Sequence, residues 1–310
     1  MLVFSGGLLG ISLIPVQAAG VTYYVATNGS DTNPGTTTQP FLTIKKAANL
    51  VNPGDTVIIR SGTYTVTSGA FPPPISADPA IYINRSGSAA GGYITFKSEV
   101  PGGAKIVSTG GYDVILINAN YIEIDGLDVS GTVGGHCIES ENSHHTRIIN
   151  GRFHDCGGAG IGANYGDYYH FEGNVTYNNA NTNPFATSGI SIYQARAISD
   201  NAPGFHNIIR NNISYNNIEF DTGTHTDGNG IIIDDFQNTQ NGSTAGLYPY
   251  QTLVENNLTF YNGAKGIVVY LSDNVVVRNN TVFWNNRDNL NDSTWRGADQ
   301  YFDVFKHHCG

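Results

Sequence analysis

The sequence predicts an all-β fold, a right-handed parallel β-helix or solenoid, in which short strands stack in successive coils. A repeated strand pattern, a repeated Asn and the near absence of helical patterns predict it. A small residue precedes Ile five times, at Cys137-Ile138, Gly160-Ile161, Gly189-Ile190, Gly230-Ile231 and Gly266-Ile267. The shortest spacing, about 23 residues, is typical of one coil of such a solenoid.

A second column of recurring residues comes after each of these strands. It consists of Gly151, Asn174, Asn212, Asn257 and Asn280. An Asn at the same turn of each coil predicts a ladder in which each side-chain amide bonds to its neighbour in the next coil.

Alternation along the strands predicts which side chains face outward. With the repeated Ile inward, the residues two positions later also face inward, and the next residues face solvent. These outward residues are Glu141, Asn164, Tyr193, Asp234 and Tyr270. We expect them to form one line along the solenoid.

The N-terminal region contains an expected export signal and an expected capping helix. Residues 1–18 read as a secretory signal peptide, because an apolar run ends in a Val-Gln-Ala cleavage pattern. Residues 19–310 are expected to form a single β-helix domain. The segment Phe41–Val51 has the periodicity of an amphipathic helix, which would cap the open apolar end of the first coil.

After Asp299–Phe305, a further expected strand, no complete coil follows, so the domain is expected to be incomplete or covered there.

Composition limits the partners. The chain has 15 Lys and Arg against 25 Asp and Glu, a formal charge of -10. Without a basic stripe, nucleic acid is not an expected partner. After the signal peptide no segment is apolar enough for a membrane span, so no membrane partner is expected either. Three cysteines leave at least one unpaired, and we expect a core that does not depend on disulfides.

The expected site is the stretch His225–Phe236, which combines a histidine and three carboxylates around Ile-Ile-Ile. Insertions at about Gln194–Gly204 and Phe236–Tyr250 follow the strands at Gly189 and Gly230, and two more insertions precede the same strands. Loops at both ends of two neighbouring strands would form the walls of a groove, with the carboxylates on its floor.

The entry region resembles a known family. The segments concerned are Tyr23-Tyr24-Val25-Ala26-Thr27-Asn28-Gly29, Pro40-Phe41-x-Thr43-Ile44-x-x-Ala47, Pro53-Gly54-Asp55-Thr56-Val57 and Gly62-Thr63-Tyr64. They resemble the start of pectate-lyase-like β-helix proteins, most of all the family 9 polysaccharide lyases, and the similarity covers most of the mature chain. It implies a fold shared by lyases, hydrolases, epimerases and binding proteins.

The resemblance also implies a calcium site. In the lyase family an Asp of an Asp-Gly pair at the start of a strand helps to bind calcium, and Asp227-Gly228 matches it. The family's next coil carries Asp-Asp-Gly-x-x-Asp, whereas this chain has Ala264-Lys265-Gly266-Ile267-Val268-Val269. Those ligands are therefore missing.

A lyase that acts on a uronic acid needs a neutralised carboxylate and a base. Asp227, together with Asp221 or Asp234, could hold a Ca2+ that bridges to the sugar acid. Lys265 lies one coil beyond Asp227–Asn229, about 4.8 Å away by strand spacing. It could be the base or simply the ion-pair partner of Asp227.

Two other interpretations remain open. Thr226-Asp227-Gly228 and Asp234-Asp235 are similar to elements of the inverting polygalacturonases of family 28, in which two acids act together. The second alternative is a non-catalytic carbohydrate-binding solenoid, with Tyr193 and Tyr270 beside Asp234.

Two further residues have both a functional and a structural interpretation. His225 could contact substrate or be a satisfied loop histidine. Asp235 could contact substrate, or it could cap the end of its strand through turn hydrogen bonds.

The leading expectation is a secreted, monomeric enzyme that acts on an extracellular acidic polysaccharide with Ca2+ as cofactor. Its expected catalytic residues are Lys265, Asp227 and Asp234.

Overall fold

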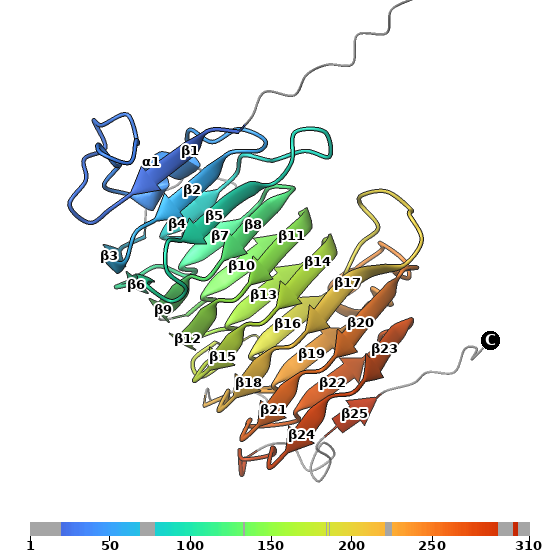
Figure 1. Ribbon diagram of the computed structural model, residues 1–310. Coiled ribbons are helices and arrows are strands. Elements are labelled where there is room, and N and C mark those ends of the chain that lie inside the picture. The colour runs from blue at the N-terminus through green and yellow to red at the C-terminus, as the bar shows by residue number, and fades with distance from the viewer. Residues whose placement is uncertain are drawn as a thin grey trace, which may run out of the picture.

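The computed structural model describes residues 20–68, 78–132, 134–183, 185, 187–220, 225–290 and 300–302. Its strands form three parallel sheets that wind as a right-handed β-helix (Figure 1). The predicted fold class is confirmed. The signal peptide at residues 1–18 and the chain end at residues 303–310 lie outside the described residues.

From β2 onward, each coil of the solenoid contributes one strand to each sheet, and β1 adds one further strand to sheet A. Sheet A, in its order of pairing, consists of β1 (Thr22–Val25), β2 (Thr56–Ile59), β5 (Ile94–Ser98), β8 (Ile122–Asp125), β11 (His144–Ile149), β14 (Asp167–Glu172), β17 (Phe205–Arg210), β20 (Gln251–Glu255) and β23 (Val275–Arg278). Sheet B consists of β3 (Gly62–Val66), β6 (Ala104–Ser108), β9 (Asp128–Thr132), β12 (Arg152–Cys156), β15 (Val175–Tyr177), β18 (Ile213–Tyr215), β21 (Leu258–Phe260) and β24 (Thr281–Phe283). Sheet C consists of β4 (Ile81–Ile83), β7 (Ile115–Ile117), β10 (Ile138–Glu141), β13 (Ile161–Asn164), β16 (Ile190–Tyr193), β19 (Ile231–Asp234), β22 (Ile267–Tyr270) and β25 (Gln300–Phe302).

The predicted register of sheet C is confirmed. Ile138, Ile161, Ile190, Ile231 and Ile267 are direct partners from one strand to the next, and all are fully buried. Apolar side chains stacked inside the coils form one continuous core from Val25 to Val269. Burial of this core drives the coils to stack, because a single coil cannot bury its own apolar face.

The helix α1 spans only Ile44–Ala48, which is shorter than the predicted Phe41–Val51. Phe41 instead forms a β-bridge with Val25, and Thr43 is the N-cap, whose side chain accepts a hydrogen bond from the amide of Lys46. These residues are extended because the bridge and the cap both require a non-helical backbone. The buried face of α1 packs into the core near β1 (Figure 1), and its role as a cap stays a prediction.

The predicted Asn ladder is present. Asn174 donates to Asn212 at 3.1 Å, Asn212 to Asn257 at 3.0 Å and Asn257 to Asn280 at 3.0 Å, all through side-chain amides. Each side-chain oxygen also accepts a backbone N–H of the preceding coil, beginning with Gly151 at 2.9 Å. The ladder thus satisfies polar groups of turns that the sheets leave without partners.

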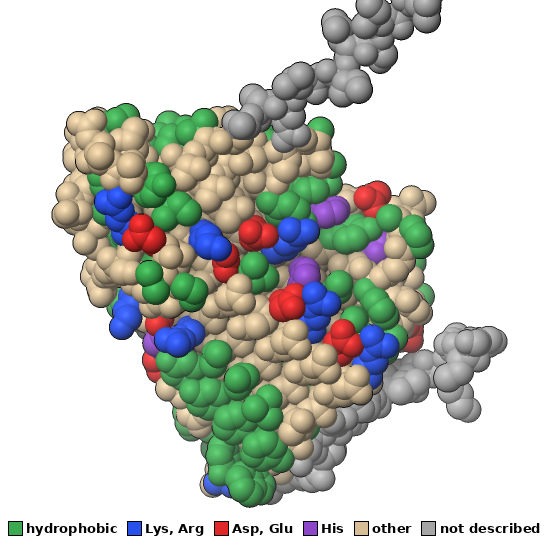
Figure 2. Space-filling view, viewed as in Figure 1, with side chains coloured by type: hydrophobic (Ala, Val, Ile, Leu, Met, Phe, Trp, Pro, Cys, Tyr) green, Lys and Arg blue, Asp and Glu red, His purple; other side chains and the backbone are tan. Residues whose placement is uncertain are grey.

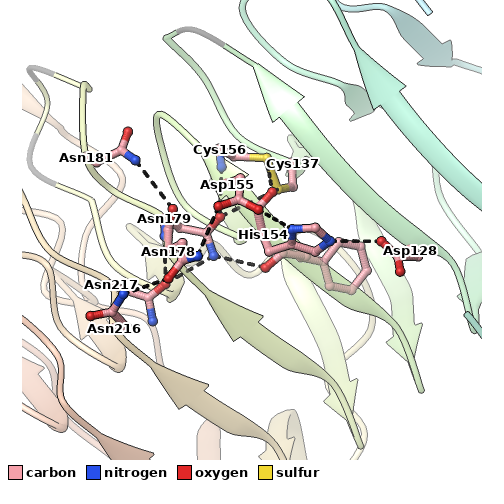
Figure 3. Close-up of polar contacts among 11 residues, drawn as sticks. Asp128, Cys137, His154, Asp155, Cys156, Asn178, Asn179, Asn181, Asn216 and Asn217 are labelled. Carbon is pink, nitrogen blue, oxygen red and sulfur yellow. Dashed lines mark hydrogen bonds and ion pairs between the residues drawn. A yellow bond between two sulfur atoms is a disulfide. The ribbon is translucent and has the colours of Figure 1, made fainter. Parts of the chain in front are cut away.

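A second Asn ladder runs beside the first and was not predicted. Asn179, Asn217, Asn262 and Asn285 repeat the same contacts at the other end of the sheet B strands, and the first two appear in Figure 3. The sequence signal was the second Asn pair of the motif at 211–217, Asn-Asn-Ile-Ser-Tyr-Asn-Asn.

Cys137 and Cys156 form a disulfide next to this second ladder, also visible in Figure 3. Both cysteines are fully buried in the core. The sequence left the pairing of the three cysteines open.

Flat rings stack along the outside of sheet B. His154, Tyr177, Tyr215, Phe260 and Phe283 form this aromatic ladder, with ring centroids 4.5 to 5.3 Å apart. Figure 2 shows a corresponding apolar area over β15, β18 and β21. At its start His154 bridges Asp155 and Asp128 (Figure 3).

In the described part of the chain, no helix is long and apolar enough to cross a membrane.

The Asn ladder yields a prediction for stability. Asn212→Ala should lower the free energy of unfolding by about 3 kcal/mol, because it leaves buried N–H and C=O groups of neighbouring coils without partners. Urea unfolding of both variants would measure this, with the exposed loop residue substituted as control in Asn201→Ala. A loss for Asn212→Ala no larger than that of the control would contradict the role given to the ladder.

Candidate functional site

A cleft of about 500 Å³ lies over sheet C. Its floor includes four residues of the predicted outward line, Asn164, Tyr193, Asp234 and Tyr270, which are direct register partners in that order. Three of the four predicted insertions contribute to its walls. The residues concerned are Asn183, Phe185 and Thr187, then Thr226 and Asp227, and finally Gln240 and Asn241. The predicted groove is therefore present above the predicted strands.

Half of the floor was missed by the sequence analysis. A second outward column, two residues earlier on each strand, lines the same cleft and consists of Glu139, Gly162, Ser191, Ile232 and Val268. The same alternation of period two predicts this column, because residues two positions apart on a strand point to the same face.

Lys265 lies on the cleft floor just before β22. Its backbone N–H donates to the side-chain oxygen of Asn229 at 2.9 Å, which fixes it one coil beyond Asp227–Asn229 as predicted. The residue is 1% exposed, and among the described residues its Nζ has no hydrogen-bond partner.

The environment of Lys265 tests one of its two predicted roles, the ion pair. Within the described part of the chain it forms no ion pair, so the predicted pair with Asp227 is wrong. Burial lowers the pKa of the Lys265 amine, because desolvation disfavours the ammonium form. A neutral amine with a free lone pair can accept a proton.

Asp227 lies one coil before Lys265 and is held by three hydrogen bonds. Its carboxylate accepts hydrogen bonds from Asn229 Nδ2 at 2.8 Å, Thr226 Oγ1 at 3.2 Å and Ser188 Oγ at 3.3 Å. Burial, followed by the negative charges of Asp234 and Glu219, raises the pKa of Asp227 well above its ordinary value. Asn229 thus joins Asp227 on one side to the backbone of Lys265 on the other.

Asp234 lines the cleft at the end of β19. It accepts one hydrogen bond, from Gln240 Nε2 at 2.9 Å. Burial raises the pKa of Asp234 to about 7, an effect that the Gln240 hydrogen bond opposes and the charge of Asp235 reinforces. Near neutral pH this carboxyl group is therefore present in both protonation states.

The aromatic residues predicted to bind substrate also line the cleft. Tyr193 and Tyr270 flank Asp234 in the register of sheet C. The hydroxyl of Tyr193 accepts a hydrogen bond from Asn241 at 2.8 Å, which ties the 236–250 loop to the floor.

The predicted substrate contact of Asp235 is wrong. This residue is fully buried at a backbone φ of 51°, and its carboxylate accepts from Gln194 Nε2, from the backbone N–H groups of Thr239 and Gln240 and from the Thr239 hydroxyl. Asp235 caps the end of β19 through turn hydrogen bonds, which was the structural alternative predicted for it.

The predicted substrate contact of His225 is not supported by its position in the structure. His225 is not among the residues that line it, and its Nδ1 lies 2.8 Å from Asp288 Oδ2. The structure therefore favours the satisfied loop histidine over a substrate contact. Asp221 lies outside the described residues.

The predicted calcium ligands fit a hard cation in type. Asp227 and Asp234 offer carboxyl oxygen atoms in one cleft, and oxygen atoms are the ligands that a hard cation prefers. Among described residues they are not part of a group of three His, Cys, Asp or Glu ligands. Further oxygens would have to come from amide, backbone or water groups.

One buried cluster does bring three such side chains together at the other end of the cleft. Ligand atoms of Asp113, His136 and Glu139 lie within 4.8 Å of one another. However, His136 Nδ1 accepts the backbone N–H of Ala159 at 2.8 Å, so the neutral ring carries its proton on Nε2. A metal-bound imidazole has the opposite arrangement, with the second nitrogen as donor, and this cluster therefore does not fit a metal.

Comparisons with known proteins agree with the fold. A family model described as "Pel9A-like, right handed beta helix region" matches residues 23–298. The pectate lyase PEL9 of Emericella nidulans is 29% identical over 141 residues, which are 40% of this chain and 32% of that protein. The match thus spans less than two thirds of the length of this curated relative.

Solved structures of lyases share the fold. The crystal structure of pectate lyase Pel9A superposes with a TM-score of 0.53 at 18% identity, covering 90% of this chain and 82% of that one. A PL6-family alginate lyase, AlyGC, gives a TM-score of 0.50 at 17% identity, covering 76% of this chain and 30% of that one. The predicted resemblance to pectate-lyase-like β-helix proteins is confirmed.

Burial of Lys265 predicts its titration. In protein labelled with [ε-13C]lysine, the Lys265 signal should titrate below the ordinary lysine pKa of 10.5, because the cleft floor disfavours its ammonium form. Lys97, whose hydrogen bond to Asp125 raises its pKa, should titrate above that value and serves as the control. Assignment by Lys265→Met would identify the signal, and a Lys265 pKa at or above 10.5 would contradict the free amine.

Proposed function

We propose that this chain, which belongs to the family of Pel9A-like right-handed β-helix proteins, is a secreted polysaccharide lyase that cleaves a uronate-containing polymer by β-elimination. The observation that supports this most is the buried, unpaired amine of Lys265 on the floor of a cleft. Its fold relatives include pectate and alginate lyases, which supports a lyase of this general class.

In the proposed reaction Lys265 is the base. Its neutral Nζ takes the proton from the carbon next to the sugar carboxylate, and the electron pair forms a carbon–carbon double bond. The bond from the neighbouring carbon to the glycosidic oxygen breaks, and this oxygen takes up a proton. That proton comes from solvent or from a protonated carboxyl group lining the cleft, and Asp234 with its pKa of about 7 suits the second role.

Asp227 and Asn229 position the base. Asn229 donates to Asp227 and accepts the backbone N–H of Lys265, so the three residues form one hydrogen-bonded unit across two coils. Such a unit limits movement of the amine relative to a bound sugar.

Calcium is the proposed cofactor, held by the ionised carboxylates of Asp227 and Asp234 with further oxygen ligands; with Asp234 bound to the cation, the proton for the glycosidic oxygen comes from solvent. When bound, it would neutralise the sugar carboxylate and so acidify the adjacent proton. The acidic cleft supports this proposal, because a polyuronate would otherwise meet like charge.

An inverting hydrolase is the second candidate, since two carboxyl groups with raised pKa values lie in one cleft. Incubation with polygalacturonate, pectin and alginate separates the candidates. A lyase produces unsaturated uronides that absorb in the ultraviolet, whereas a hydrolase produces new reducing ends without that absorbance. Binding to insoluble polymer without either product would leave a carbohydrate-binding solenoid.

Removal of the base should abolish the reaction. Lys265→Ala is expected to lower kcat by about a thousandfold, because general base catalysis contributes 10² to 10⁴. The rate of unsaturated uronide formation measures it, and Lys97→Ala on sheet A is the matched control that should keep full activity. A Lys265→Ala enzyme with more than a tenth of the original rate would exclude Lys265 as the base.

Chelation tests the cofactor separately. Excess EDTA should stop product formation and added Ca2+ should restore it, while Asp227→Asn should raise the Ca2+ concentration needed for half-maximal activity. Activity that persists after exhaustive chelation would remove calcium from the mechanism and leave the role of Lys265 intact.

A further inference from the structure

The cleft has two ends of different chemistry. Lys265 and β22 lie at one end, and β10 lies at the other, with β13, β16 and β19 between them. Four strand spacings of about 4.8 Å separate the two ends by roughly 19 Å, the length of several sugar units. A polymer lying along the cleft therefore meets both ends at once.

The β10 end is acidic. Asp113 Oδ1 accepts the backbone N–H of His136 at 2.8 Å, while Asp113 Oδ2 is buried and has no partner among the described residues when the carboxyl is ionised. Burial, followed by the charge of Glu139 and a hydrogen bond between the two carboxyl groups, raises the pKa of Asp113 well above its ordinary value. When Asp113 is protonated and donates this proton to Glu139 in a hydrogen bond, Asp113 Oδ2 gains a partner. The two carboxyl groups then carry one negative charge between them.

No described basic side chain compensates this charge inside the β10 end. Lys265 is the one Lys or Arg among the described residues that line the cleft, and it belongs to the other end. His136 stays neutral, because burial lowers its pKa and its Nδ1 is occupied by a backbone N–H. The guanidinium of Arg196 lies over the ring of Tyr165 at 4.3 Å and is not part of the lining.

The remaining groups at the β10 end suit an uncharged sugar. Tyr112, Tyr165 and Phe185 supply aromatic surface, and Phe185 is 74% exposed. Asn183 and Asn164 add amide groups, of which Asn183 donates to the Tyr112 hydroxyl at 3.0 Å and Asn164 donates to Glu139. Aromatic faces and carboxylate acceptors together recognise the apolar faces and hydroxyl donors of a sugar ring.

We propose that the Asp113–Glu139 pair makes the β10 end of the cleft a subsite for an uncharged sugar unit and disfavours a free uronate there. The inference rests on the proposed function, and it narrows the substrate to polymers in which uronates are interspersed with neutral sugars or with esterified uronates. Glu139 is the residue that determines this selectivity.

The test measures binding, so that it does not depend on turnover. In a Lys265→Ala background, isothermal titration would compare three oligosaccharides of equal length: all free uronate, methyl-esterified uronate, and uronate alternating with a neutral sugar. One or both of the uncharged-unit ligands should bind about tenfold more tightly than the all-uronate ligand, since like charges face each other only in the latter. Which of the two binds more tightly identifies the source of the uncharged unit.

Glu139→Gln keeps the shape of the side chain and removes its charge. It should strengthen binding of the all-uronate ligand about tenfold and change the best uncharged-unit ligand much less. Glu99→Gln, an exposed carboxylate paired with Arg60 on another face, is the matched control and should change none of them. Unfolding curves would verify that both variants are folded.

Three results would overturn the inference: equal affinity for all three ligands, no binding of either uncharged-unit ligand, or weaker all-uronate binding in Glu139→Gln. If the weaker all-uronate binding of Glu139→Gln appears only when Ca2+ is present, the Asp113–Glu139 pair binds a cation instead. If the lyase assay fails while this preference holds, the proposed reaction is wrong and the subsite stands; the reverse outcome leaves the reaction and removes the subsite.

Discussion

The whole structure depends on parallel hydrogen bonding between identical positions of successive coils. Backbone pairing fixes the register within each sheet, and the two Asn ladders extend that pairing into the turns, where backbone groups would otherwise be buried without partners. Because every coil repeats the same geometry, a residue on one coil lies directly over its counterpart on the next. Side chains that are distant in sequence, such as Glu139 and Lys265, thereby line one cleft.

The low dielectric of the cleft floor controls the chemistry. Lys265 is buried without an ion-pair partner among the described residues; the carboxyl group of Asp113 is buried and those of Asp227 and Asp234 are partly buried, without described cations beside them. Each therefore shifts toward its neutral form. Such uncompensated groups destabilise a folded protein, and they persist where binding or catalysis requires them.

The sequence was sufficient for those features that repeat. The Ile column, the first Asn ladder and the outward line through Asn164, Tyr193, Asp234 and Tyr270 follow from a period of one coil and an alternation of two, and all are present. The groove followed from the positions of insertions. Repetition makes these features predictable, because one correct alignment places every coil.

Features that depend on a single local contact were not predictable in this way. Asp235 lies next to Asp234 in sequence, but a positive φ turns its side chain into the loop, where it binds Thr239 and Gln240. The length of α1 depends on the bridge of Phe41 to Val25, and the environment of Lys265 depends on which neighbours reach its amine. Asp113 and Glu139 lie on two different coils. The repeat could be aligned only from Cys137 onward, so the coil of Asp113 was not included and the contact was not predicted.

The Cys137–Cys156 disulfide closes one turn of the solenoid into a covalent ring. Solenoids lose structure from their ends inward, since each coil is supported only by its neighbours. The bridge spans a sequence separation of 19 residues, and a loop of that size is stabilised by about 3 kcal/mol relative to the open chain. In an oxidising compartment the bridge should therefore oppose fraying of the coil that contains β10 and β12, because it restricts the unfolded form of that coil.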